Sequence, residues 1–320
     1  MKANIRKIFS LIIPLLIGVA IIYYQYTTLS SEELEKIKIS FIKANYFYIY
    51  LSLFIALFGF WSRAYRWKFA LKHLGYKTKF YNDLLTVCVS YLVNLTIPRS
   101  GEVSRAALLK KHEGVPFDKA LGTIVAERIV DMLIFLLFVA IGFLLQFDTI
   151  YKYLINNGVE FETLIWAGIL GFVLFVIFII VWIYAEWKII LKLKQKLSGL
   201  IEGMQSILKM KDKWKYIFHS FFIWFSYLAM FYVTIFALPE TTNISFDVVV
   251  MGFIFGTLAV GFTNGGLGAY PLAVASILGL YGISEGIGTA FGYLIWVSQT
   301  LLTIFLGLLS YLLLPILNKK

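Results

Sequence analysis

The sequence Pro98-Arg99-Ser100-Gly101-Glu102-Val103-Ser104-Arg105 places three charged side chains directly after an apolar segment, residues 84–98. A helix of about fifteen residues reaches about 22 Å, which is short of the roughly 30 Å hydrocarbon core of a bilayer. A full crossing would also put the basic residues that follow on the outer side, against the positive-inside rule. We therefore expect residues 80–111 to form a re-entrant hairpin that opens to the cytoplasm, with Gly101 letting the chain turn after Pro98.

The whole chain is apolar enough to lie in lipid. Its 320 residues are 60% hydrophobic and 18% aromatic, with a mean hydropathy of +0.82. A soluble domain is nearer half apolar and carries more charge. The composition therefore predicts an all-α, polytopic integral membrane protein. The net charge of +11 comes from short basic segments between apolar runs, which topology explains better than a nucleic-acid partner.

The apolar runs predict six full spans, approximately residues 8–24, 46–61, 120–146, 164–184, 214–238 and 288–314. Arg63 and Arg66 are expected to begin a basic loop after the second span. By the positive-inside rule that loop is cytoplasmic, and the path then leaves both termini cytoplasmic. The expected location is the inner membrane of a bacterial-type cell.

Two further segments are typical of helices that lie on the membrane surface. Residues 30–44 begin with Ser30 and Glu33 in the spacing of a capping box, followed by apolar residues on one helical face. Residues 186–209 place apolar residues at helical spacing with lysines elsewhere, which predicts a cytoplasmic amphipathic helix.

A second interrupted segment, the glycine-rich hairpin of residues 247–281, lies in the last third of the chain. Its two short apolar runs are joined and broken by residues expected to control conformation, namely Asn264, Gly265, Gly266, Gly268 and Pro271. Such residues let helices pack closely or unwind at a joint. Because one hairpin is expected to open inward and the other outward, the pair suggests an inverted repeat around a transport site.

Six charged residues near the first hairpin form the candidate substrate site: Arg99, Glu102, Arg105, Glu127, Arg128 and Asp131. If all were unpaired and faced lipid at the bilayer centre, they would together cost on the order of 15 kcal/mol. Spacings of three and four residues allow them to pair on shared helical faces. An arginine left over from pairing could bind a lipid phosphate. The same residues are also compatible with the cytoplasmic headgroup level, where the acidic ones would hold hairpin to helix.

A family resemblance rests on these motifs. The run Pro98, Arg99, Gly101, Glu102, Arg105, Gly114, Ala120, Glu127-Arg128 and Asp131 resembles the signature of the lysylphosphatidylglycerol synthase transmembrane, or flippase-like, family. Gly265-Gly266-Leu267-Gly268 is similar to that family's second motif, although Asn264 stands where the family has proline. The family includes the membrane domain of the multiple peptide resistance factor. The resemblance implies a membrane domain that moves lipids between leaflets, without the factor's soluble synthase domain.

Three functions remain open at this stage. The first is a lipid flippase or transporter, the second a non-transporting scaffold or lipid-binding regulator, and the third a membrane-embedded lipid-modifying enzyme. The expected partners are membrane lipids with anionic or aminoacylated headgroups. No catalytic residue, cofactor or metal is expected, because His112 after Ser104-Arg105 only superficially resembles a lipid phosphatase motif and has no carboxylate partner at a defined spacing. No pattern reports on oligomeric state.

Overall fold

The computed structural model describes residues 16–97, 99–148, 209–263 and 265–319, together with the single residues 151, 162, 166 and 207. All the regular elements within these ranges are helices, which confirms the all-α prediction. Four of them are long and apolar enough to cross a membrane. They are α3 (Tyr46–His73), α6 (Phe117–Leu145), α10 (Lys213–Thr234) with the 3-10 turn η1 (Ile235–Ala237), and α13 (Glu285–Leu317).

These four helices match the spans predicted to begin near residues 46, 120, 214 and 288. The described part of the first predicted span, residues 16–24, is also helical, and this helix continues to residue 28. The span predicted over residues 164–184 and the amphipathic helix over 186–209 lie outside the described residues, apart from isolated positions. One boundary was wrong, because α3 does not end at residue 61 but continues through His73. The helical spacing of buried side chains continues past residue 61, so the predicted basic loop begins only after His73.

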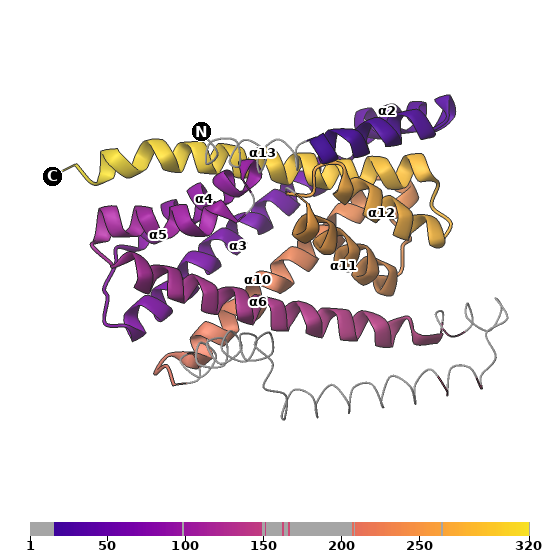
Figure 1. Ribbon diagram of the computed structural model, residues 1–320. Coiled ribbons are helices and arrows are strands. Elements are labelled where there is room, and N and C mark those ends of the chain that lie inside the picture. The colour runs from indigo at the N-terminus through magenta and orange to yellow at the C-terminus, as the bar shows by residue number, and fades with distance from the viewer. Residues whose placement is uncertain are drawn as a thin grey trace, which may run out of the picture.

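The broken hairpins predicted over residues 80–111 and 247–281 are present as two pairs of short helices. The first pair is α4 (Phe80–Thr96) and α5 (Ser100–Glu113), and the second is α11 (Phe246–Phe262) and α12 (Ala269–Leu280). The two pairs occupy opposite ends of the bundle (Figure 1). Their turns meet between them, where the Leu95 side chain lies so close to Gly265 that a Cβ there would be 3.0 Å from it.

The same order of elements occurs twice along the chain, and the two copies run in opposite directions through the bundle. A long helix, a hairpin and a long helix follow one another as α3, α4–α5 and α6, and again as α10, α11–α12 and α13. In Figure 1, α6 and α13 run along opposite sides of the molecule, while α3 and α10 cross diagonally between them. The 3-10 turn η2 (Pro239–Thr241) leads from α10 to α11. This is the arrangement that an inverted repeat requires.

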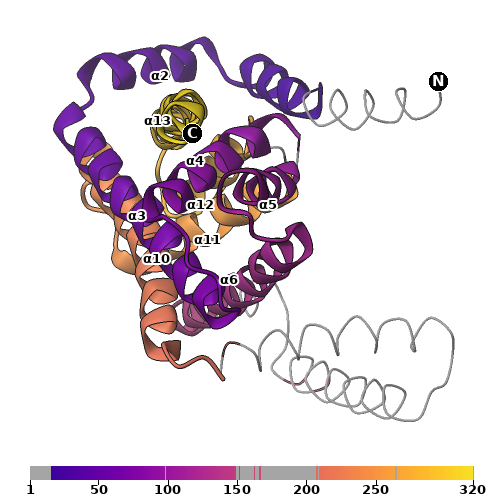
Figure 2. The same cartoon turned by 90° about the vertical axis from the view of Figure 1, so that its left-hand side faces the viewer.

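Helix α2 (Ser31–Lys43) lies across α13, as Figure 2 shows. Ser30 caps it by accepting a hydrogen bond from the backbone N–H of Glu33 at 3.2 Å. The Glu33 carboxylate does not complete the capping box. It accepts instead from Lys36 at 2.7 Å and from the backbone N–H of Gly286, in the first turn of α13.

Two apolar clusters divide the interior. One joins α3, α4, α5 and the first half of α6, and includes Ala64, Leu109 and Ile124. The other surrounds α10 to α13 and takes in the later half of α6, starting at Ile134. Between Ile124 and Ile134, α6 adds no buried residue to either cluster and contributes only Ala126 and Val130 at their margins, and it is here that the charged residues lie.

Candidate functional site

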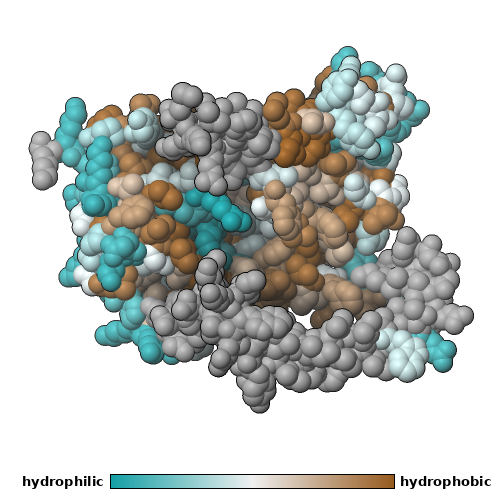
Figure 3. Space-filling model, viewed as in Figure 1, coloured by the Kyte–Doolittle hydropathy of each residue, from teal (hydrophilic) through white to brown (hydrophobic). Residues whose placement is uncertain are grey.

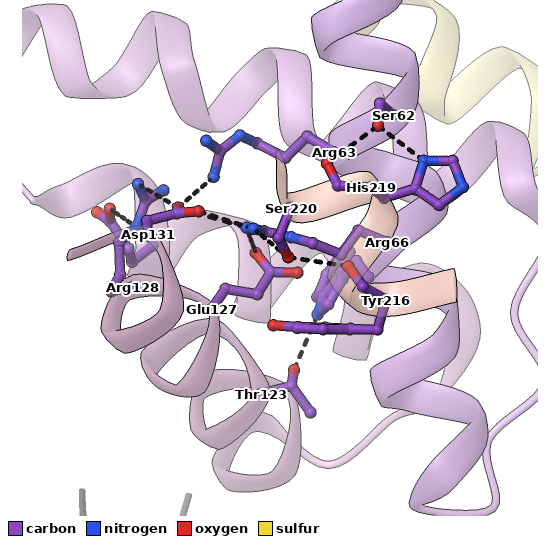
Figure 4. A network of polar contacts seen from close by, with 12 residues as sticks. Ser62, Arg63, Arg66, Thr123, Glu127, Arg128, Asp131, Tyr216, His219 and Ser220 are labelled. Atoms are coloured by element: carbon purple, nitrogen blue, oxygen red, sulfur yellow. Dashed lines mark hydrogen bonds and ion pairs between the residues drawn. The ribbon is translucent and has the colours of Figure 1, made fainter. Parts of the chain in front are cut away.

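A buried polar network fills the space between the two apolar clusters. Glu127, Arg128 and Asp131 come from α6, and Asp131 lies midway along that helix. Figure 4 shows Arg63 and Arg66 reaching them from α3, with Ser220 from α10. Asp131 lies at the midpoint of a helix long enough to cross a membrane and is buried, and this favours the interpretation of a site within the bundle.

Asp131 is held by two arginines from α3. Its Oδ2 accepts from Arg63 Nη1 at 2.9 Å, and its Oδ1 accepts from Arg66 Nη1 at 2.7 Å. Arg66 also donates to Ser220 Oγ at 3.2 Å. The side chains of Arg63 and Arg66 are only 3% and 0% exposed, so their charges depend on these partners.

Glu127 and Arg105 form a second buried pair. Arg105 Nη1 donates to Glu127 Oε2 at 2.9 Å, and Nη2 donates to Oε1 at 3.4 Å. The Arg105 guanidinium also stacks 3.6 Å from the ring centroid of Trp67, a cation–π contact that strengthens when water is excluded. The Trp67 indole donates in turn to Thr123 Oγ1 at 2.8 Å. Arg105 was predicted to hold a lipid phosphate, but here Glu127 occupies its guanidinium.

Arg128 is the accessible member of the network. Its side chain is 43% exposed, with Nε 3.2 Å from Glu102 Oε1 and Nη1 3.7 Å from Asp131 Oδ2. Neither contact has the two-point geometry that makes an arginine pair strong. Glu102 Oε2 has no hydrogen-bond partner among the described residues. The pair of Arg128 and Glu102 can therefore exchange partners at small cost, unlike the buried pairs.

The formal charges of the network do not cancel. It contains four arginines (Arg63, Arg66, Arg105 and Arg128) and three carboxylates (Glu102, Glu127 and Asp131). Arg128 and Glu102 balance each other, so the excess positive charge lies in the buried part of the network, where three arginines meet two carboxylates. Figure 3 shows hydrophilic surface reaching inward near the centre of the face, between more hydrophobic areas.

Arg99 adds a further exposed positive charge at the turn of the first hairpin. It caps α5 with φ 61°, in the left-handed region that side chains other than glycine rarely adopt. Gly101 has a different role from the predicted one, because it lies within α5 and not at a left-handed position. Its N–H donates to Asn94 Oδ1 at 2.7 Å, and a Cβ would collide with Ser90. Gly101 thus permits close contact between α4 and α5. Pro98 lies outside the described residues.

The turn of the second hairpin is built on glycine. Gly265, Gly266 and Gly268 have φ values of 63°, 81° and 68°, where any side chain is strained. The Gly265 carbonyl accepts from the Trp296 indole on α13 at 2.7 Å. Pro271 was predicted to interrupt a helix, but it lies in the first turn of α12, where its missing N–H is not needed. Asn264 lies outside the described residues.

Arg63 and Arg66 were missed as members of the site. The sequence offered a signal, because they are three residues apart and the small and aromatic residues around them continue the spacing of α3 through Trp67. Within residues 16–97, 99–148, 209–263 and 265–319, no three His, Cys, Asp or Glu side chains gather as a metal site would require.

Fold and site together define a multi-pass helical membrane protein whose interior holds a charged network where two opposed broken hairpins meet. The chain belongs to the family described as the lysylphosphatidylglycerol synthase TM region, whose family model matches residues 11–307. The resemblance recognised in the sequence is thereby confirmed. Membership points to a role connected with membrane lipids.

The chain is also similar to the UPF0104 membrane protein MJ1595 of Methanocaldococcus jannaschii. The two are 32% identical over 173 residues, which are 52% of this chain and 48% of the relative. The match therefore spans about half the length of that relative. No solved structure matches the chain.

Proposed function

We propose that the protein moves a phospholipid or a lipid-linked substrate between leaflets, and that the headgroup passes the exposed face of the network. The observation that carries this proposal is Arg128, a guanidinium that is 43% exposed near the middle of a spanning helix. Charge at this depth is rare and marks functional sites. A planar guanidinium suits a phosphate group, which it can bind through two parallel hydrogen bonds.

The network divides into a fixed part and an exchangeable part. The buried contacts of Asp131 and Glu127 with three arginines hold α3, α5 and α6 together and leave one positive charge in the interior. The exchangeable part is Arg128, which is 43% exposed and faces the substrate, with the partly buried Glu102 beside it. Arg128 takes the phosphate of an anionic headgroup, while Glu102 receives the ammonium of an aminoacylated one. Arg99 at the hairpin turn offers the phosphate a second cationic contact.

Movement across the membrane uses the two hairpins. They open toward opposite ends of the bundle, and their turns meet beside the network. Opening one hairpin at a time would expose the site to one leaflet and then to the other, as in inverted-repeat transporters. We place the protein in the cell membrane of a bacterial-type cell, as its inner membrane, with both termini cytoplasmic.

Catalysis is not part of the proposal. The arrangement closest to a catalytic pair is Ser62 and His219, whose Oγ and Nδ1 lie 2.7 Å apart. Both residues are buried, and no carboxylate contacts the His219 ring among the described residues. A serine activated by histidine needs a positioned base and room for a substrate. This hydrogen bond therefore ties α3 to α10.

The test is movement of headgroup-labelled lipids between leaflets in proteoliposomes. Wild-type protein should move anionic or aminoacylated phosphatidylglycerol faster than protein-free vesicles do. Arg128→Gln should slow this about tenfold, the factor for 1.4 kcal/mol, which is within the range for a hydrogen bond to a charged group. Lys72→Gln is the matched control, because Lys72 forms an exposed ion pair with Asp212 away from the network. If wild-type vesicles match empty ones for every lipid, the protein is a lipid-binding scaffold and not a transporter.

A further inference from the structure

An open groove of about 280 Å³ lies beside the network, between α6, α10 and α11. Asp131 lies at its polar end, and its walls include Phe135, Trp224, Leu258 and Phe262. Phe262 is 85% exposed on the surface of the bundle. The groove is smaller than the roughly 300 to 1,000 Å³ of pockets that enclose a whole small molecule. It has room for a segment of an apolar chain that leaves the rest of its molecule outside.

The groove exists because one of two equivalent seams is closed and the other is open. In the inverted repeat the contact of α4 with α13 corresponds to the contact of α11 with α6. The first seam is closed, because Gly307 lets Leu92 lie tightly against α13. The second seam is closed only near the outer end of α6, where Gly142 meets Ile254. Toward the middle of the bundle α6 and α11 separate, and the groove lies between them.

The charged side chains at one end of the groove determine which kind of molecule can bind in it. Asp131 lines the groove, and Arg128, which is not itself a lining residue, lies beside it with Nη1 3.7 Å from Asp131 Oδ2. The Asp131 carboxylate is already held by Arg63 and Arg66, so the exposed Arg128 guanidinium is the charge available to a ligand at this end. An amphiphile with an anionic group at one end and a hydrocarbon chain at the other matches both features at once. Hydrocarbon gains little by leaving lipid for an apolar groove, because the two environments are equally apolar. The groove therefore orients the chain, and the charge supplies selectivity.

We propose, on the basis of the function proposed above, that this groove holds one acyl chain of an anionic phospholipid while Arg128 binds its phosphate. The lipid then enters sideways from the bilayer between α6 and α11. The chain stays in contact with lipid through the open side of the groove while the headgroup crosses. Entry is through the open seam alone, since the seam between α4 and α13 is filled.

Gly261 provides a direct test. It lines the groove, and a Cβ built on it has no atom within 4 Å. Gly261→Leu therefore projects a side chain into the groove with no clash at its Cβ, and leucine favours the helix more than glycine does. Gly279 on α12 also has open space around it and lies outside the groove. Gly279→Leu is thus the matched control for the same substitution in a helix.

Two measurements on the full-length protein in proteoliposomes separate this inference from the proposed function. The first is leaflet-to-leaflet movement of headgroup-labelled phosphatidylglycerol. The second is cross-linking by phosphatidylglycerol with a photoactivatable acyl chain, read as labelling of residues 257–262 relative to Phe305, an exposed residue on α13. We expect Gly261→Leu to lower both about tenfold, and Gly279→Leu to change neither.

Each outcome decides one of the two claims. If wild type moves lipid and Gly261→Leu moves it equally fast, the groove is not the chain site, although the proposed function stands. If wild type moves no lipid but its groove is labelled and Gly261→Leu abolishes the labelling, the chain site is supported and transport is not. Labelling of residues 257–262 no stronger than that of Phe305 overturns the inference.

Discussion

The two broken hairpins follow the same path through opposite halves of the bundle, but different chemistry holds each of them. The hairpin α4–α5 is fixed to α6 through the buried pair of Arg105 and Glu127. The hairpin α11–α12 has no such pair among its described residues and depends on glycine turns and close packing, such as Gly266 against Tyr270. In the proposed function, the charged hairpin therefore takes part in recognition, and the glycine hairpin permits close approach of the helices.

One feature is shared by both hairpins. The first helix of each is pinned at its open end to the C-terminal cap of a long helix from the other half. In the hairpin α4–α5, Asn82 and Asn318 exchange two amide hydrogen bonds, at 2.9 and 2.7 Å. In the hairpin α11–α12, Asp247 accepts a hydrogen bond from Gln146 at 2.6 Å. We call these contacts the α4 latch and the α11 latch, and opening of either hairpin would have to begin at its latch.

The largest predicted effect is the loss of Glu127. Glu127→Gln leaves the Arg105 guanidinium buried beside Trp67 without its anion, and breaking a buried pair in this way costs about 3 to 5 kcal/mol of unfolding free energy. Denaturant unfolding in detergent measures it. Adding Arg105→Met to Glu127→Gln should recover part of the loss, because no charge is then left unpaired. If the single variant is as stable as wild type, the pair is not holding the hairpin.

The next effect concerns the glycine hairpin. Gly266→Ala should cost about 1 to 3 kcal/mol, because Gly266 has φ 81° and a Cβ would lie 3.0 Å from Tyr270 Cβ and Val260 Cγ2. Gly279→Ala, which is in open space within a helix, should be neutral or slightly stabilising. Thermal unfolding of both variants makes the comparison. Equal melting temperatures of the two variants would show that the left-handed turn at Gly266 does not require glycine.

Loss of one latch should have a smaller effect, which chemical labelling of the single cysteine can measure. Cys88 is buried on α4 at 4% exposure, and its carbonyl lies near Gly307 on α13. Asn318→Ala should lower the cost of separating α4 from α13 by about 1 kcal/mol, which makes maleimide labelling of Cys88 about fivefold faster. Gln146→Ala, at the α11 latch, should leave the labelling rate unchanged. Equal acceleration by both variants would mean that the hairpins do not open separately.

The smallest effect is a pH dependence at the contact of α2 with α13. The hydrogen bond from Lys36, together with the backbone N–H of Gly286, lowers the pKa of Glu33 below its ordinary value. A carboxyl with a lowered pKa stabilises the fold above its unfolded pKa, and that stability is lost as the pH falls through the lowered value. Melting temperatures between pH 7 and pH 3 should therefore fall more for wild type than for Glu33→Gln. Parallel curves would contradict this role of Glu33.

The sequence predicted the path of the chain better than the contacts of the site. Long apolar runs locate spans, and short ones with a proline or paired glycines locate hairpins, because the bilayer sets a length that a helix must meet. The same criterion failed at Arg63 and Arg66, where charge was taken as the end of a span. Partners from α10 and α6 bury both arginines, and only tertiary structure brings those partners together.

The spacing of charged residues along the chain also did not predict which side chains pair within the network. Arg128 and Asp131 are three residues apart and were expected to pair, yet Asp131 makes its shorter bonds to Arg63 and Arg66, more than sixty residues away. The two arginines of α3 occupy Asp131 in the interior, and Arg128 is left 43% exposed. In the proposed function the phosphate contact therefore moves from Arg105 to Arg128, both of which the sequence had placed in the site.

The central claim is that the exposed Arg128 selects anionic lipid headgroups for transfer. Its most direct test is the ratio of the initial transfer rates of phosphatidylglycerol and phosphatidylcholine in the same proteoliposomes, for wild type and Arg128→Gln. We predict a ratio several-fold above one in wild type that falls close to one in the variant, because Arg128 favours a headgroup with a net negative charge over one whose choline ammonium balances the phosphate charge. A ratio unchanged by the substitution would show that Arg128 does not contact the headgroup.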